Sequence, residues 1–211
     1  MTGLILKDLL NLRKYMKQLG LILILYIFLS INFKSPNYII FMMILLTSMM
    51  IVTSMAYDES TKWDKYALTM PITKEDLVKS KYALLVLLAL SGGIISIIFG
   101  FIISKFIGVT NYKELLLTSG GVALASLFLF SILLPIIFKL GTEKARIFMM
   151  LIFAIPAILV TGLSSFLKDL SIPMPTEEQI KYLGYVSPII VLIFFVISYQ
   201  ISVYILNKKD F

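Results

Sequence analysis

Apolar residues fall in six long runs separated by short polar segments. A run of about 20 apolar residues crosses the hydrocarbon core of a bilayer, and a charge at its centre is unfavourable. The last five runs have 20 to 24 residues and no charged side chain, whereas the first has 15 and needs its flanks or a thinner bilayer. The runs are 19–33, 38–57, 82–104, 115–138, 147–166 and 186–206. They predict an all-α polytopic membrane protein with six transmembrane helices in one domain, 1–211.

The first 18 residues show a different periodicity. Apolar side chains recur along one helical face, and polar ones occupy another. The apolar face comprises Ile5, Leu9, Leu12 and Met16, and the polar face Lys7, Asn11, Lys14 and Gln18. A basic amphipathic helix ahead of a first span is typical of a segment in the membrane interface. It would anchor the chain or help to bind a partner.

Composition agrees with this class. The chain is 59% hydrophobic and 15% charged, where soluble domains carry about 25% charged residues. With an inside N-terminus, 14 of the 19 Lys and Arg residues fall in cytoplasmic segments and 5 in outer loops. The positive-inside rule therefore predicts that both termini are cytoplasmic. Topology and anionic inner-leaflet lipid explain the net charge of +7 without a nucleic-acid partner.

The sequence offers little chemistry of its own. It contains no Cys and no His, which excludes thiolate nucleophiles, histidine bases and Cys/His metal sites. The spans carry no acidic or basic group to bind a coupling ion, and no Walker A motif is present. We therefore expect neither an enzyme nor a chain that binds a cofactor or metal itself. Energy for uphill movement would come from another polypeptide.

The segment between the second and third runs is mixed in character. Residues 58–71, "DESTKWDKYALTMP", interleave acids and bases with aromatic side chains, and we call them the elbow. Thr73 and Asp76 then form the pattern of a capping box, which predicts a helix running into the third span. An aromatic anchor with a polar rim suits a docking surface, although aromatic residues at a membrane boundary are also common.

The outer loop 167–185 contains a second capping pattern, Thr176 with Gln179, and predicts a short helix. That helix would cap a pathway or simply lie on the outer face of the membrane.

The elbow motif resembles that of bacterial ABC-type exporter permeases of the six-span, ABC-2-like kind. Those permeases have an acid and then an aromatic residue, here Glu59 and Trp63. A run "Y-x-x-x-M/L-P-I/V-T/S" follows, here Tyr66 and residues 70–73, and then "S/A-K-Y/F", here residues 80–82. The resemblance implies that a separate ATP-binding cassette subunit, with ATP and Mg²⁺, docks on this segment. The implied docking residues are Asp58, Glu59, Lys62, Trp63, Asp64, Tyr66, Met70 and Pro71.

The resemblance also implies a second cytoplasmic contact in "KLGTEKAR", residues 139–146, whose basic residues would equally serve as a positive-inside anchor. The contact residues are Thr142, Glu143, Lys144 and Arg146. A second permease subunit would complete the transporter, with a homodimer favoured. Small residues at 92, 96, 100 and 104 could pack between copies or within one chain.

The cargo is the least specified property. Uncharged spans rich in large apolar side chains suit an apolar or amphipathic cargo, such as a membrane-active peptide or a lipid. The resembling family includes short six-span permeases that export amphipathic peptides, so the resemblance favours amphipathic or antimicrobial peptides, including cytolytic peptides such as phenol-soluble modulins, and next small hydrophobic drugs. The resemblance places the chain in a bacterial plasma membrane, in contact with lipid. Two alternatives stay open: a membrane sensor or immunity protein that binds such peptides without transporting them, and a passive channel, for which polar pore rings are lacking.

Overall fold

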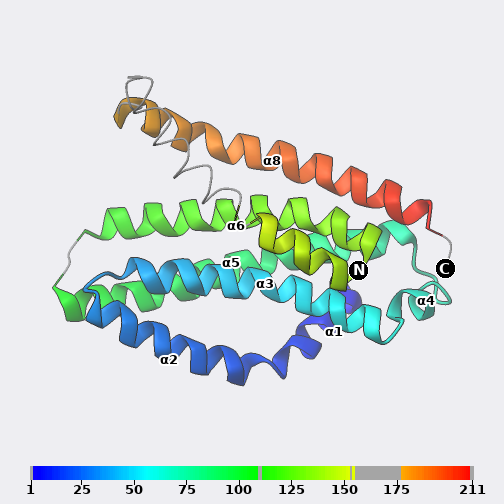
Figure 1. The fold of residues 1–211 in the computed structure, drawn as a ribbon, viewed down its shortest axis with the longest axis horizontal. Coiled ribbons are helices and arrows are strands. Elements are labelled where there is room, and N and C mark those ends of the chain that lie inside the picture. Colours follow the sequence, from blue (N-terminus) through cyan, green and yellow to red (C-terminus); the bar gives the residue numbers. More distant parts are fainter. Residues whose placement is uncertain (1, 109–110, 153, 155–176, 210–211) are drawn as a thin grey trace.

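The computed structural model describes residues 2–108, 111–152, 154 and 177–209, and most of them are helical (Figure 1). The helices are α1 (Thr2–Arg13), α2 (Met16–Asn32), α3 (Asn37–Ser60), α4 (Trp63–Ala67), α5 (Lys74–Ile107), α6 (Tyr112–Leu140) and α8 (Glu177–Asn207). Residues 142–152 are helical as well. No strand occurs among the described residues, so the predicted all-α class is confirmed.

Four helices are long and apolar enough to cross a membrane by themselves: α3, α5, α6 and the part of α8 from Gly184 to Asn207. They correspond to four of the predicted runs. The first predicted run is α2, which reaches membrane-spanning length only together with α1, at a bend of 61° between the two helices. The described residues thus hold four or five candidate spans. Most of the predicted run 147–166, and the predicted cap at Thr176, lie outside them, and six spans remain a prediction.

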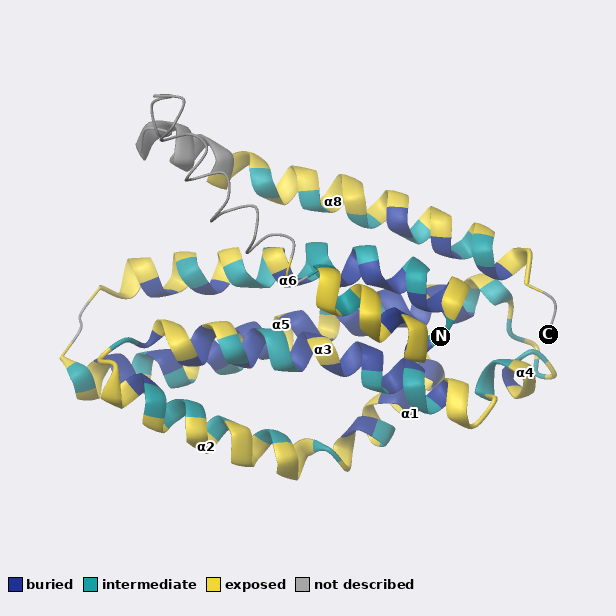
Figure 2. Cartoon of the chain, in the orientation of Figure 1, coloured by how far each residue is buried: buried dark blue, intermediate teal, exposed yellow. Residues whose placement is uncertain are grey.

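The long helices lie side by side around α3 (Figure 1). α3 packs on α2, α5 and α6, while α8 packs on α6 and α5. Burial follows this arrangement: α3 and α5 are buried along much of their length, whereas α2 and α8 are mostly exposed (Figure 2). The exposed faces are themselves apolar, as at Leu21 and Leu192. Such faces are stable against lipid and unfavourable against water.

Small residues bring α5 close to its neighbours within the chain. A Cβ atom added at Gly92 would lie 1.9 Å from Thr47 Oγ1 of α3, and one at Gly100 would lie 3.3 Å from Ile40 and from Leu115. The small-residue ridge predicted on α5 therefore packs inside one subunit.

The face of α1 that packs inside the chain comprises Leu4, Asp8 and Leu12. Of the apolar residues predicted to face the membrane, Leu9 and Met16 are exposed and Leu12 is buried, and the interfacial position of this helix stays a prediction. Asp8 is buried because it finds charged partners on other helices.

Candidate coupling site at the elbow

The elbow is an ordered turn between two long helices. α3 ends at Ser60, and Lys62 adopts a left-handed conformation, with φ of 52°, that redirects the chain into the single turn of α4. Thr73 then caps α5: its Oγ1 accepts from the Asp76 N–H at 3.1 Å, and its own N–H donates to the Asp76 carboxylate at 3.3 Å. The predicted capping box is confirmed. The local hydrogen bonds therefore fix the direction in which α5 leaves the elbow.

A cluster of four charges, three of them buried and the fourth, Lys7, partly exposed, lies behind the elbow. Lys81 Nζ is 2.8 Å from Asp8 Oδ2 and 2.5 Å from Asp58 Oδ2, and it donates to Ser54 Oγ at 3.0 Å. Lys7 Nζ is 2.6 Å from Asp58 Oδ1 and 3.0 Å from Asp8 Oδ1. Only 1% of Asp8, 4% of Asp58 and 6% of Lys81 is exposed. We call these four residues the ion cluster; its charges sum to zero.

The ion cluster joins three helices at one point. Asp8 comes from α1, Asp58 from α3 and Lys81 from α5. Removing one member of a buried pair leaves an uncompensated charge, which costs several kcal/mol, about 3–5 in typical cases. Lys7 also lies 4.4 Å from the centre of the Trp63 ring, so α4 contacts the same cluster. A displacement of α4 should therefore shift α1, α3 and α5 together.

A second joint connects the end of α3 to the helical residues 142–152. Glu59 Oε2 accepts from both the backbone N–H and the hydroxyl of Thr142, each at 2.6 Å. Gly141, with φ of 84°, precedes this helix, and a Cβ atom there would lie 2.5 Å from Glu59 Oε1. A carboxylate at a helix N-terminus satisfies backbone donors that would otherwise lack partners. The structure thus brings the two predicted contact segments together into one surface.

The predicted docking residues divide by exposure. Asp58 and Thr142 are buried and engaged within the chain, while Trp63, Asp64 and Met70 are partly buried. Tyr66 is 57% exposed. The other exposed members are Glu59, Lys62, Pro71, Glu143, Lys144 and Arg146. Docking by these residues remains a prediction, and only the partly or fully exposed ones offer a partner their side chains.

Asp64 has an unusual environment for an elbow carboxylate. Burial desolvates it, and the negative charge of Asp58 lies nearby, so its pKa is raised above the ordinary value; Lys81 and Lys209 oppose this shift. It lines a cavity of about 70 Å³ with Asp58 and Glu59. This cavity lies between the ion cluster and the Glu59–Thr142 joint.

The sequence did not reveal the inner members of this site. Four of them were not predicted as site residues: Lys7, Asp8, Ser54 and Lys81. Lys81 does lie in the "S/A-K-Y/F" motif at residues 80–82. A usable signal was present in the spacing Leu4, Asp8 and Leu12, which places a carboxylate in the middle of a buried face.

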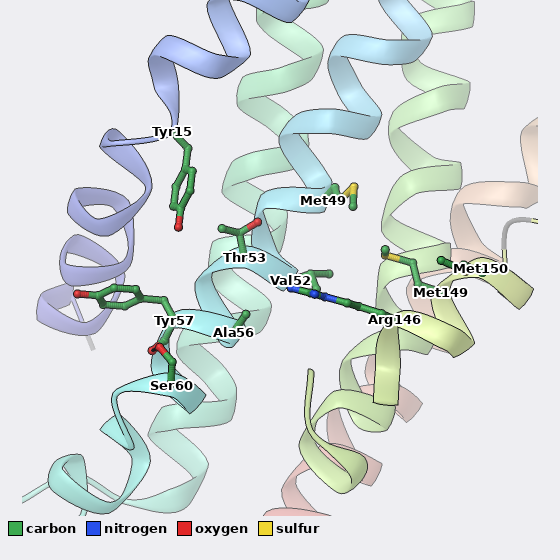
Figure 3. A pocket seen from close by; sticks show the side chains of 10 residues that line it. All are labelled: Tyr15, Met49, Val52, Thr53, Ala56, Tyr57, Ser60, Arg146, Met149 and Met150. Atoms are coloured by element: carbon green, nitrogen blue, oxygen red, sulfur yellow. Dashed lines mark hydrogen bonds between the residues drawn. The ribbon is translucent and has the colours of Figure 1, made fainter. Parts of the chain in front are cut away.

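A larger cavity of about 510 Å³ opens beside α3 (Figure 3). Arg146 reaches from the helical residues 142–152 toward α3, and the flexible apolar side chains of Met49, Met149 and Met150 lie around it. Tyr15 and Tyr57 close one side. The cavity therefore combines one cation with adaptable apolar and aromatic surface.

These features define a polytopic helical membrane protein whose ordered elbow is locked to its bundle by buried charges. Residues 3–207 match the family model described as "ABC-2 family transporter protein". The chain therefore belongs to the ABC-2 transporter family, as a membrane permease component that is not itself an ATPase, and the family implies an ATP-binding cassette partner. Searches among curated proteins and among solved structures gave no match.

Proposed function

We propose that this chain is the permease subunit of an ATP-driven exporter of amphipathic or hydrophobic peptides in the bacterial plasma membrane. Two copies form the pathway, and a separate subunit binds ATP and Mg²⁺. The observation that carries the proposal is the elbow, whose exposed aromatic and basic side chains lie directly outside the ion cluster. The family supplies the transport class; direction and cargo are our inference.

The exposed part of the elbow is the docking surface for the ATP-binding subunit. Tyr66 projects from α4 with its ring 5.5 Å from that of Trp63, which forms an aromatic anchor flanked by Lys62 and Lys65. Such an anchor within a polar rim is typical of interface hot spots. Glu143 and Lys144 follow Thr142, which donates to Glu59 of the elbow, and this proximity supports a partner surface that contacts both segments.

Movement of the docked subunit is transmitted through the ion cluster. α4 is connected to it by the Lys7–Trp63 contact, and the cluster in turn holds α1, α3 and α5. Because the charges are desolvated, their relative positions are costly to change. A rigid displacement of all three helices is therefore favoured over the separation of any one of them.

The cavity of Figure 3 is our candidate for the first cargo contact. Methionine side chains adapt to apolar surfaces of different shapes, and Arg146 offers a cation to a carboxylate of the peptide. An amphipathic peptide with acidic groups satisfies both. This supports peptides over uncharged drugs.

The first experiment is co-purification in detergent with the ATP-binding subunit, followed by an ATPase assay with and without this chain. A stable complex with altered hydrolysis supports the permease assignment. A chain that binds amphipathic peptide yet forms no complex would support the sensor or immunity alternative instead.

The docking surface is tested by Tyr66→Ala combined with Lys62→Glu. Both side chains are exposed, so the change should weaken capture of the partner while leaving the fold intact. Trp63 and Glu59 are poorer choices, because the former stacks under Lys7 and the latter holds Thr142. Lys113→Glu, on an exposed position of α6, is the matched control. Equal capture by the double variant and the control would rule out docking on the elbow.

Cargo and direction are tested in proteoliposomes that contain the complex. ATP should drive a fluorescent amphipathic peptide from the elbow side of the membrane to the other side. Arg146→Gln should raise the peptide concentration needed for half-maximal transport severalfold, because the cavity loses its cation. Transport of the same peptide in the reverse direction would contradict the proposed export.

A further inference from the structure

A second groove lies in the angle between α1 and α2. Its volume is about 560 Å³, and its walls come from α1, α2, α3 and α5. It shares no lining residue with the cavity of Figure 3. The angle itself is the 61° bend that is visible between the two helices in Figure 1.

The groove presents hydrocarbon almost throughout. Leu19, Leu23 and Leu88 are among its apolar lining residues. The two hydroxyls in its wall are already used within their own helices: Thr47 donates to Met43 O at 2.8 Å, and Ser91 donates to Leu88 O at 3.0 Å. The walls therefore favour an alkyl chain over a polar ligand.

One cation, Arg13, lines the groove at the end of α1. A second, Lys17 in the first turn of α2, is not a lining residue but follows the lining residue Met16 in the sequence. Both side chains are exposed. Neither Arg13 nor Lys17 belongs to an ion pair between described residues.

We propose that this groove binds an anionic phospholipid of the inner leaflet. One acyl chain fills the space between α1, α2, α3 and α5, and the headgroup phosphate lies against Arg13 and Lys17. The assignment to the inner leaflet rests on the proposed orientation of the elbow; the binding itself does not.

Charge complementarity selects this occupant. Arg13 in the wall of the apolar groove, with Lys17 next to the lining residue Met16, matches an anionic headgroup above an alkyl chain, and the guanidinium of Arg13 can contact two phosphate oxygens at once. A zwitterionic lipid brings a positive group near the same cations and is disfavoured. Basic residues close to a membrane surface attract anionic lipid in an additive way.

The bound lipid would set the position of α1. Leu12 of α1 lines the groove, and Asp8, one turn earlier, belongs to the ion cluster. Filling the groove supports the packing of α1 against the bundle and so the cluster that connects the elbow to α3 and α5. Anionic lipid would thereby act as a structural ligand of the coupling site.

The test is native mass spectrometry of the full-length chain in detergent, titrated with phosphatidylglycerol or with phosphatidylcholine of the same acyl chains. We expect tighter binding of phosphatidylglycerol. Arg13→Gln with Lys17→Gln should weaken it by roughly fivefold for each cation removed. Lys79→Gln with Lys105→Gln, which removes two exposed basic residues outside the groove, is the matched control.

A second pair of variants tests the apolar part. No atom lies within 4 Å of the Cβ position at Gly20, a lining residue, so Gly20→Trp can fill the groove without distorting α2. It should abolish high-affinity binding. Gly120→Trp, at an exposed helix position that also has no neighbour within 4 Å, is the control.

Equal affinity for the two lipids, or unchanged phosphatidylglycerol binding in Gly20→Trp, would overturn the proposal. Displacement of the bound lipid by an amphipathic peptide would assign the groove to cargo and overturn it as well. None of these measurements needs the ATP-binding subunit. The lipid proposal can therefore be contradicted while the permease function is supported, and the permease function can be contradicted while lipid binding is observed.

Discussion

Two buried polar networks hold this bundle together by different chemistry. The ion cluster joins α1, α3 and α5 through four charges. One residue further along α5, Tyr82 begins a neutral network: its hydroxyl lies 2.5 Å from Ser198 Oγ and 2.8 Å from Ser202 Oγ of α8, and Ser198 donates to Ser131 O of α6.

The two networks differ in the penalty for breaking them. Loss of a charged partner leaves a buried ion that has neither a counter-ion nor hydration, which is strongly destabilising. Loss of a hydroxyl leaves only a small dipole that finds other partners, and hydrogen bonds between membrane helices contribute only about 0.6 kcal/mol on average. The charged joint should therefore resist separation, while the neutral one tolerates small shifts of α8. In the proposed mechanism, the elbow side moves as one body and α8 adjusts to it.

The largest effect is expected from Lys81→Met, which removes the central cation of the ion cluster. Asp8 and Asp58 then share only Lys7, and we expect a loss of about 3–5 kcal/mol of stability, measured by unfolding in detergent. Lys79→Met, at an exposed position two residues earlier, should have little effect. Adding Asp8→Asn restores charge balance and should recover part of the loss. If the Lys81→Met and Lys79→Met variants are equally stable, the ion cluster does not stabilise the bundle more than an exposed charge does, and the proposed difference between the two networks is wrong.

Close packing in the span should give the next largest effect. In Gly92→Ala, the added methyl group would meet Thr47 Oγ1 at 1.9 Å and force α3 and α5 apart, at about 1–3 kcal/mol. Gly93→Ala is the matched control, because no atom lies within 4 Å of that Cβ position. Thermal unfolding of the two variants side by side measures the difference. A larger loss in Gly93→Ala would contradict the described contact of α3 with α5.

The neutral network is tested by Tyr82→Phe. The ring keeps its edge-on contacts with Phe195 and Tyr199, so only the hydroxyl is lost, and we expect about 0.6 kcal/mol. Tyr199→Phe, whose hydroxyl donates to Glu75 at the surface, is the control for a hydroxyl removed near water. A loss as large as that of Lys81→Met would show that the neutral joint is as rigid as the charged one.

The smallest effect is expected from Asp64→Asn, and it depends on pH. The pKa of Asp64 is raised in the folded chain, so its ionised form is disfavoured by folding. Wild type should therefore lose stability relative to Asp64→Asn as pH rises through the ordinary carboxyl pKa and then the raised one. Below that range both side chains are neutral, and the two unfolding midpoints should converge. A wild type that gains stability over the variant as pH rises would contradict the burial of this carboxylate.

Much of the fold follows from hydrophobicity along the chain. The described helices match four predicted runs, and the cap at Thr73 was predicted because its signal is local. The ion cluster was not predicted because paired members such as Asp8 and Lys81 are 73 residues apart along the chain and meet only after the helices pack. Judged by its own hydrophobicity, Asp8 would be expected to face water. It is buried because it has charged partners in the packed bundle, among them Lys81 of α5.

The candidate site also has a part that local sequence predicts and a part that depends on contacts between distant residues. The elbow was found because its residues are contiguous, whereas the contact of Glu59 with Thr142 spans 83 residues. The bend between α1 and α2, and with it the groove, depends on packing that no local pattern records. Length alone suggested that the first run was short, and α2 becomes a candidate span only when the bent pair of α1 and α2 is counted as one.

The 73-residue separation of Asp8 from Lys81 has a consequence for biosynthesis. Lys7 and Asp8 leave the ribosome early, long before α5 has been made, so α1 cannot form its contacts with α5 while α2 and α3 are inserted. The cluster closes only when Lys81 arrives, and from then on the early segment is fixed. Before that point Asp8 and Asp58 share Lys7 as their cluster cation, so an incomplete chain carries a net negative charge where the finished subunit is neutral.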